Sequence, residues 1–214
     1  DTYVTDEKTA SEKRKIAREK ISDILQILSG TKASDDAFYI LNSGRYEFKN
    51  KGIDLFINAL GKLNKSAELN KEIVAVIAVP ANISGIYKEL EYRRDGKKPI
   101  EGHTDLPCTH HIFGYEYDAV LNSLRENGLN NNSEDKVKVM FVPSYLNGND
   151  GVFNLKYNDF LYAFDLTVFP SYYEPWGYTP MESIAHGIPT VTTDLAGFGR
   201  YIQDEKYENE SVAI

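Results

Sequence analysis

The stretch from Val168 to Gly199 reads Val-Phe-Pro-Ser-Tyr-Tyr-Glu-Pro-Trp-Gly-Tyr-Thr-Pro-Met-Glu-Ser-Ile-Ala-His-Gly-Ile-Pro-Thr-Val-Thr-Thr-Asp-Leu-Ala-Gly-Phe-Gly. Its order predicts the end of a buried strand, an aromatic loop, a helix over Thr179–His186, a short strand over Thr190–Thr193 and a glycine-rich loop. Two carboxylates, Glu174 and Glu182, lie in the aromatic loop and in the first turn of that helix. Parallel sheets bind ligands beyond the carboxyl ends of their strands. The stretch therefore predicts one part of a ligand site on a parallel sheet.

Strands and helices alternate along the rest of the chain. The apolar, β-branched run Ile73–Val79 is typical of a strand buried on both faces of a parallel sheet. The pattern predicts an α/β fold, a Rossmann-like parallel sheet with helices on both faces, in a single domain over 1–214. The predicted strands are Phe38–Gly44, Ile73–Val79, Val137–Val142, Leu166–Phe169 and Thr190–Thr193, and the predicted helices are 12–29, 52–60, 117–127, 157–164 and 179–186.

Two further features of the chain outside the sheet are predicted. The leading helix 12–29 has one apolar face, with Ser11 as its cap and Gly30 after its end. The polar residues 86–111 are expected to form an irregular, solvated excursion, helical at most at its start.

Composition excludes several classes of protein. The formal net charge of −8 disfavours binding to nucleic acid or to an anionic membrane surface, both of which need basic patches. No apolar run is long enough to span a bilayer, which takes about 18 residues, and no signal peptide begins the chain. The single cysteine, Cys108, excludes an internal disulfide and indicates a cytoplasmic location. Both ends lack the features of natural termini, so we expect a piece of a longer protein.

Two cations follow the first predicted strand, in the motif Gly44-Arg-Tyr-Glu-Phe-Lys-Asn-Lys-Gly52. A diphosphate needs charge-assisted donors, and Arg45 suits a bidentate grip while Lys51 supplies a point charge. The spacing alone leaves an exposed surface pair as an open alternative.

The helix start at Thr179-Pro-Met-Glu182 has the pattern of a capping box, with Thr179 as N-cap and Glu182 at the third helical position. Gly177 lets the backbone come close to a ligand, and the helix start offers free N–H groups to an anion. If Glu182 binds a ligand, most of the capping falls to Thr179.

Aromatic side chains also follow the strands. Tyr145 and Tyr157 come after the third strand and are candidates for stacking on a flat base, although a half-buried aromatic is the commoner role. Trp176 and Tyr178 come after the fourth strand, within the same predicted site.

Cys108, His110 and His111 form a candidate metal cluster that we do not favour. Adjacent histidines rarely bind one ion, and a second ligand pair at zinc spacing is missing. We expect no metal and no cofactor. His186 precedes Gly187 at a helix end and is interpreted as structural.

The motifs at 44–52 and 168–182 resemble those of the glycogen synthase family of the animal and fungal type. The likeness runs from about Ile21 to Ile202. It implies the C-terminal, donor-binding half of a GT-B glycosyltransferase, in which two Rossmann-like domains enclose the active site. It also implies that an N-terminal half, with acceptor contacts, is missing from this chain.

Residue roles follow from the resemblance. The family's motif residues at Arg45 and Lys51 hold the donor phosphates, and two glutamates eight positions apart, as Glu174 and Glu182 are, face the transferred glucose and the nucleotide ribose. In the family, the aromatic residues at the positions of Tyr145 and Tyr157 sandwich the uracil base of the donor. We therefore expect Arg45, Lys51 and Glu174 to be catalytic. The donor-binding set is completed by Tyr145, Tyr157, Trp176, Gly177, Tyr178, Thr179 and Glu182.

The resemblance implies that the parent protein transfers glucose from UDP-glucose to the non-reducing end of an α-1,4-glucan with retention of configuration, and ADP-glucose is the less favoured donor. Two alternatives stay open, namely a GT-B glucosyltransferase with a sucrose- or trehalose-type acceptor, and a non-catalytic binding module. A homo-oligomer also stays open. The isolated chain is expected to be inactive because half of the cleft is missing.

Overall fold

The computed structural model describes residues 6–94, 107–205 and 212–214. Within these residues, six strands form one parallel sheet in the order β5-β2-β1-β6-β7-β8, and β3 and β4 form a separate antiparallel pair. The strands are β1 (Phe38–Ser43), β2 (Ile73–Ala78), β3 (Ile83–Ile86), β4 (His110–Ile112), β5 (Val137–Val142), β6 (Leu166–Val168), β7 (Thr190–Val191) and β8 (Val212–Ala213).

Taken in chain order, the strands of the parallel sheet lie in the sequence 3-2-1-4-5-6, which is the Rossmann arrangement. The predicted α/β fold is therefore confirmed. The direction of winding changes between β1 and β6, and this switch point is where such sheets bind ligands. The buried Asn42 side chain ties the two strands together there, because its amide donates to the Val168 carbonyl at 2.7 Å.

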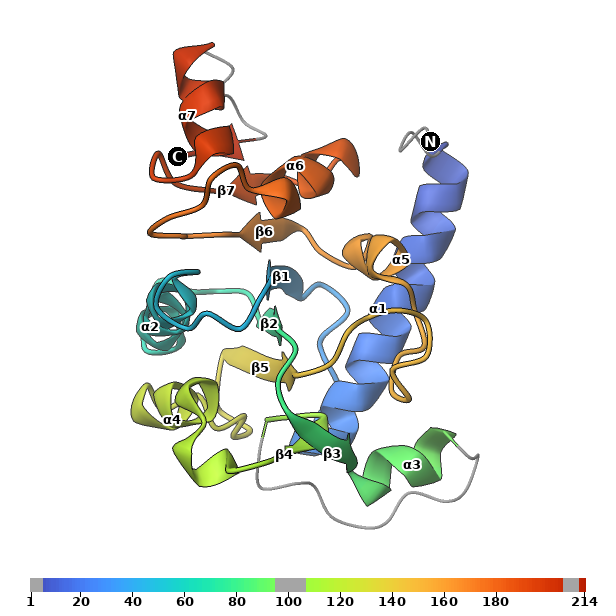
Figure 1. Ribbon diagram of the computed structural model, residues 1–214. Coiled ribbons are helices and arrows are strands. Elements are labelled where there is room, and N and C mark those ends of the chain that lie inside the picture. The colour runs from blue at the N-terminus through green and yellow to red at the C-terminus, as the bar shows by residue number, and fades with distance from the viewer. Residues whose placement is uncertain (1–5, 95–106, 206–211) are drawn as a thin grey trace.

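Helices cover both faces of the sheet (Figure 1). Figure 1 shows α2 and α4 on one side and α1 and α5 on the other, while α6 and α7 lie by β6 and β7. The helices are α1 (Glu7–Ser29), α2 (Ile53–Asn64), α3 (Lys88–Arg94), α4 (Ala119–Glu126), α5 (Tyr157–Leu161), α6 (Tyr178–Ala185) and α7 (Gly197–Asp204), with a 3-10 turn at Tyr115–Tyr117.

Alternate residues of the central strands build a core on each face. On β2, Val74 and Val76 pack into the cluster that contains α1 and α5, while Ala75 and Ile77 pack into the cluster that contains α2 and α4. All six residues of β2 are buried, because a parallel strand covered on both sides needs apolar side chains in both directions.

An ionic cluster ties α1 to the strands. Asp165, just before β6, pairs with both Arg14 and Arg18, and it also accepts a hydrogen bond from the Tyr39 amide at 2.8 Å. The Arg18 guanidinium lies 4.3 Å from the centre of the Tyr39 ring. These polar contacts are directional, whereas apolar packing is not. They therefore position α1 relative to β1 and β6.

Two local predictions were wrong. Helix α1 begins at Glu7, and its cap is Asp6, which accepts from the Thr9 amide at 3.0 Å, so Ser11 lies inside the helix. The excursion over 86–111 was expected to be irregular beyond its start, but it contains the strand β4, while α3 fits the expected helical start and residues 95–106 lie outside the described part of the chain.

The predicted end of the leading helix is confirmed, because Gly30 ends α1 in the left-handed conformation at φ 78°.

Every helix within residues 6–94, 107–205 and 212–214 is too short or too polar to cross a membrane.

Candidate functional site

A cavity of about 330 Å³ opens at the carboxyl ends of the central strands. Its walls come from residues that directly follow β1, β2 and β5 and from the first residues of α5 and α6. The lining residues are Ser43, Gly44, Arg45, Ala78, Pro80, Ser144, Tyr145, Leu146, Asn147, Tyr157 and Thr179. The cavity therefore lies at the switch point, where a ligand is expected in this class of sheet.

Four of the predicted site residues line this cavity: Arg45, Tyr145, Tyr157 and Thr179. The predicted catalytic and donor-binding set did not contain the other lining residues, which are Ser43, Gly44, Ala78, Pro80, Ser144, Leu146 and Asn147. Pro80 could have been found from the sequence, because it follows the second strand and the same carboxyl-end rule applies there.

The two tyrosines differ in their surroundings. The Tyr157 hydroxyl is held by the Ser43 hydroxyl at 2.7 Å, and burial raises the pKa of Tyr157. Its ring is thus fixed against the end of β1. The Tyr145 side chain is 73% exposed and contributes an open face to the other side of the cavity. A planar group between them would meet one rigid and one adjustable aromatic wall.

Lys51 and Glu174 lie beside the cavity and contact each other. Their side chains form an ion pair and are only 15% and 18% exposed. Arg45 is different, because its side chain is 73% exposed and pairs with Glu47 at 3.2 Å. The structure thus brings the three predicted catalytic residues, from two distant loops, to one edge of the sheet.

The loops that carry these residues are fastened together through their backbones. The Tyr172 amide donates to the Asn50 carbonyl at 2.8 Å. Gly52, at φ 64°, packs so closely on Pro170 that a Cβ there would lie 1.9 Å from the Pro170 carbonyl oxygen. A side chain at position 52 would push the two loops apart, so glycine is required for the approach.

The start of α6 differs from the predicted capping box. The helix begins at Tyr178 after Gly177, which has φ 100° and gives no side-chain cap. Glu182 therefore does not cap the helix, and Thr179 is a helical residue that faces the cavity. The physical reason is Gly177, whose positive φ lets the chain enter the helix two residues before the start that the capping box predicts. The uncapped start leaves amide groups for an anion.

Glu182 lies near Tyr157 and His186. Burial raises the pKa of the Glu182 carboxyl above its ordinary value, and the nearby His186 offsets part of this rise. His186 itself ends α6, and its Nδ1 lies 2.8 Å from the Glu182 carbonyl, in agreement with a structural role.

Trp176 packs away from the cavity. Its ring lies 5.9 Å from that of Phe198 and 5.8 Å from that of Tyr201, between the loop and α7. Tyr178 is 67% exposed and does not line the cavity. The Gly197 amide donates to the Glu174 carbonyl at 3.0 Å, so α7 supports the loop that holds Glu174.

The Cys108 and His110 side chains are both buried, Cys108 in the core beside β5 and His110 in β4 of the small sheet. His110 Nδ1 lies 2.7 Å from the Thr109 hydroxyl, and Nε2 lies 3.3 Å from the Asp150 carbonyl. Burial raises the pKa of the Cys108 thiol to about 12 and lowers that of His110. Within the described residues, no three His, Cys, Asp or Glu side chains gather in a way that would hold a metal ion.

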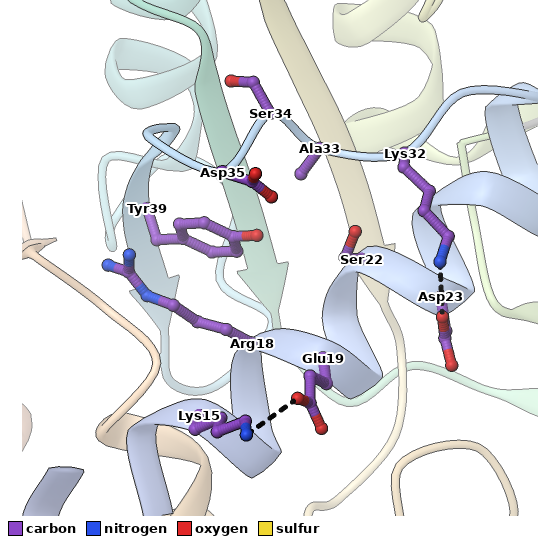
Figure 2. Close-up of a pocket in the computed structure, with 10 residues that line it drawn as sticks. All are labelled: Lys15, Arg18, Glu19, Ser22, Asp23, Lys32, Ala33, Ser34, Asp35 and Tyr39. Carbon is purple, nitrogen blue, oxygen red and sulfur yellow. Dashed lines mark ion pairs between the residues drawn. The ribbon is translucent and has the colours of Figure 1, made fainter.

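A larger cavity, of about 580 Å³, lies between α1 and the segment that leads into β1 (Figure 2). Four of its charged side chains form two pairs, Lys15 with Glu19 at 3.9 Å and Lys32 with Asp23 at 3.6 Å, and the lining also contains Arg18 and Asp35. Figure 2 shows Arg18 beside the Tyr39 ring. Because these charges are balanced and the cavity adjoins the entry to β1, it is a poorer anion site than the cavity at the switch point.

Similarity to known proteins extends over most of the chain. A model of the family described as "Glycogen synthase" matches residues 14–90 and 101–214. Glycogen [starch] synthase isoform 1 of Saccharomyces cerevisiae is 34% identical in an alignment that covers 79% of this chain and 32% of that protein. Glycogen [starch] synthase of Caenorhabditis elegans is 33% identical in an alignment that covers 84% of this chain and 35% of that protein. The chain thus spans about a third of the length of these curated relatives.

Among solved structures, the C-terminal domain of a glycosyl transferase group 1 family protein (LpcC) from Francisella tularensis superposes with a TM-score of 0.48 and 14% identity, over 92% of this chain and 73% of that one.

Proposed function

Because the chain belongs to the glycogen synthase family, we propose that its cavity binds the nucleotide sugar from which the parent protein transfers glucose. The observation that carries this proposal is the cavity at the switch point, with two tyrosines, an arginine and the start of α6 around one space. A nucleoside diphosphate needs stacking walls and anion donors in this arrangement.

We assign the parts of the donor as follows. The uracil base lies against Tyr145 and Tyr157, and the ribose lies towards Glu182. The diphosphate lies between Arg45, Lys51 and the uncapped start of α6. The glucose then extends towards Glu174, which contacts Lys51. Trp176 packs on α7 and supports this loop, and Tyr178 is exposed outside the cavity. In this assignment neither residue contacts the donor, so both leave the donor-binding set predicted from the sequence.

The chemistry of the parent protein is the transfer of glucose to the non-reducing end of an α-1,4-glucan with retention of configuration. Negative charge grows on the diphosphate as the glycosidic bond breaks. Arg45, Lys51 and the α6 amides neutralise that charge where it develops, which lowers the barrier without a metal ion. This chain forms one half of a GT-B enzyme in this proposal, acting in the cytoplasm, and the family match favours a glucan over a sucrose- or trehalose-type acceptor.

The isolated 214-residue chain is expected to show no glucan elongation, because the acceptor side of the cleft belongs to another part of the parent. Incubation with UDP-glucose and a short maltooligosaccharide, followed by chromatography of the products, measures this. A product longer by one glucose would contradict the proposed division of the site.

Nucleotide binding is expected to depend on Arg45. Replacement Arg45→Ala should weaken UDP binding about tenfold, the lower end of the range for a charge-assisted contact of about 1.5–3 kcal/mol, since this side chain is exposed. Calorimetric titration with UDP, UDP-glucose and ADP measures the dissociation constants.

The matched control is Arg125→Ala, which removes the same charge from the last turn of α4. This variant should bind UDP as the unaltered chain does. Absence of UDP binding, or equal losses in both variants, would remove the nucleotide-site proposal. ADP binding as tight as that of UDP would remove the assignment of a uridine donor.

A further inference from the structure

The ion pair between Lys51 and Glu174 lies outside the lining of the cavity, where the proposal places the diphosphate and the glucose of the donor. Both side chains are mostly buried, at 15% and 18% exposure, and they come from the loops after β1 and β6. An ion pair shielded from water is coupled more strongly than one at the surface. The charge of Lys51 is therefore already neutralised in the ligand-free chain.

Lys51 has two competing anionic partners once a nucleotide arrives. We propose that Glu174 is the resident counterion of Lys51, that a phosphate of the donor displaces it, and that the displaced carboxylate then accepts hydrogen bonds from the sugar. This inference rests on the proposed nucleotide-sugar site. It adds that Glu174 weakens the binding of a bare nucleotide and strengthens the binding of the nucleotide sugar. Glu174 therefore sets the preference of the site for UDP-glucose over UDP.

The backbone around the pair favours an exchange of side chains over a movement of loops. The Glu174 carbonyl accepts a hydrogen bond from the Gly197 amide at 3.0 Å, and the Glu174 backbone forms an isolated parallel β-bridge with Ala196. On the other side, the Lys51 amide donates to the Glu47 carbonyl at 2.8 Å. With both backbones fixed, the pair can separate by rotation of the side chains, without a movement of the loops.

The fate of the displaced carboxylate differs between the two ligands. With UDP alone, Glu174 loses its partner in a largely buried place, which carries a desolvation penalty. With UDP-glucose, the sugar is bonded to the very phosphate that takes over Lys51. Its hydroxyl groups therefore lie within reach of the carboxylate and restore its hydrogen bonds.

The replacement Glu174→Gln tests this inference, because glutamine keeps the shape and removes the charge. UDP should bind about tenfold more tightly than to the unaltered chain, since a charge-assisted contact no longer has to be broken. The gain for UDP-glucose should be smaller, because the sugar loses a charged acceptor. The dissociation constant of UDP divided by that of UDP-glucose, both measured by calorimetry, should therefore be lower in the variant than in the unaltered chain.

Two controls separate this effect from a general change of charge. Asp194→Asn removes one negative charge from an exposed position after β7 and should leave UDP affinity within about twofold of the unaltered chain. In a Lys51→Met background, Glu174→Gln should give no gain for UDP, because the counterion has no cation to release.

The outcomes distinguish this inference from the proposed function. If the unaltered chain binds UDP and Glu174→Gln binds it equally or more weakly, the counterion role is wrong while the nucleotide site stands. A gain that persists in the Lys51→Met background would likewise overturn the role. If the unaltered chain does not bind UDP, the nucleotide site and the counterion role fall together.

Discussion

Replacement of Gly52 by alanine is expected to lower the free energy of unfolding by about 3–4 kcal/mol. The left-handed backbone at φ 64° accounts for about 1–2 kcal/mol of this loss in a residue with a side chain. The remainder comes from the close approach, because the new Cβ would lie 1.9 Å from the Pro170 carbonyl oxygen. The backbone on both sides would have to move. Urea unfolding monitored by tryptophan fluorescence measures the change.

Gly30→Ala is the matched control. Gly30 has φ 78°, and no heavy atom lies within 4 Å of a Cβ built there, so the variant isolates the cost of the left-handed conformation. A loss of about 1–2 kcal/mol is expected. Equal losses at Gly30 and Gly52 would show that the contact with Pro170 does not hold the loops together. The Gly52 variant should also bind UDP more weakly under conditions in which it remains folded, because the adjacent Lys51 moves with the loop.

Replacement of Phe160 by alanine is expected to cost about 3–5 kcal/mol, the range for removal of a fully buried aromatic ring. The side chain is 0% exposed and lies 5.0 Å and 5.2 Å from the rings of Phe153 and Phe164. The two neighbouring rings are themselves fully buried in the same core cluster, so removal of the Phe160 ring takes away packing from both. Equilibrium urea unfolding, with the slope of the transition compared between variants, measures the loss.

Phe113→Ala serves as the control for Phe160→Ala. Its side chain is 61% exposed, so truncation should change stability by at most about 0.5 kcal/mol. A loss at Phe160 below about 1 kcal/mol would contradict the packing of α5 on the core. Since α5 begins at Tyr157, the Phe160 variant also tests whether the base-binding wall depends on the core behind it.

The sheet and the cation motif could be predicted because their signals are local. Ile73–Ala78 is an apolar run, Val137–Val142 is apolar except for Lys138, and each forms a fully buried strand. Parallel strands with helices between them leave few arrangements, so the carboxyl-end rule predicted that Arg45, Tyr145, Tyr157 and Thr179 lie at one edge of the sheet, and the structure shows these four residues around one cavity.

What escaped prediction depends on contacts between distant residues or on single backbone angles. The pairing of β3 with β4 joins Ile83 to Ile112, and neither short strand has a pattern of its own. The Thr179-Pro-Met-Glu182 motif satisfies the rule for a capping box, yet one dihedral angle at Gly177 moved the start of the helix. The pairing of Lys51 with Glu174 joins two loops far apart in the chain, and no spacing in the sequence reports it.

The central position of β1 also affects the order in which a growing chain acquires its parts. β1, β2 and β5 lie side by side and are all synthesised before residue 143, so this half of the sheet is available early. The cavity, however, is lined in part by Tyr157 and Thr179, which are synthesised later. The ion pair of Lys51 likewise forms only after Glu174 has been synthesised. During synthesis, the strands β1, β2 and β5 are therefore complete before the ligand site is, and nucleotide cannot assist the earliest steps of folding.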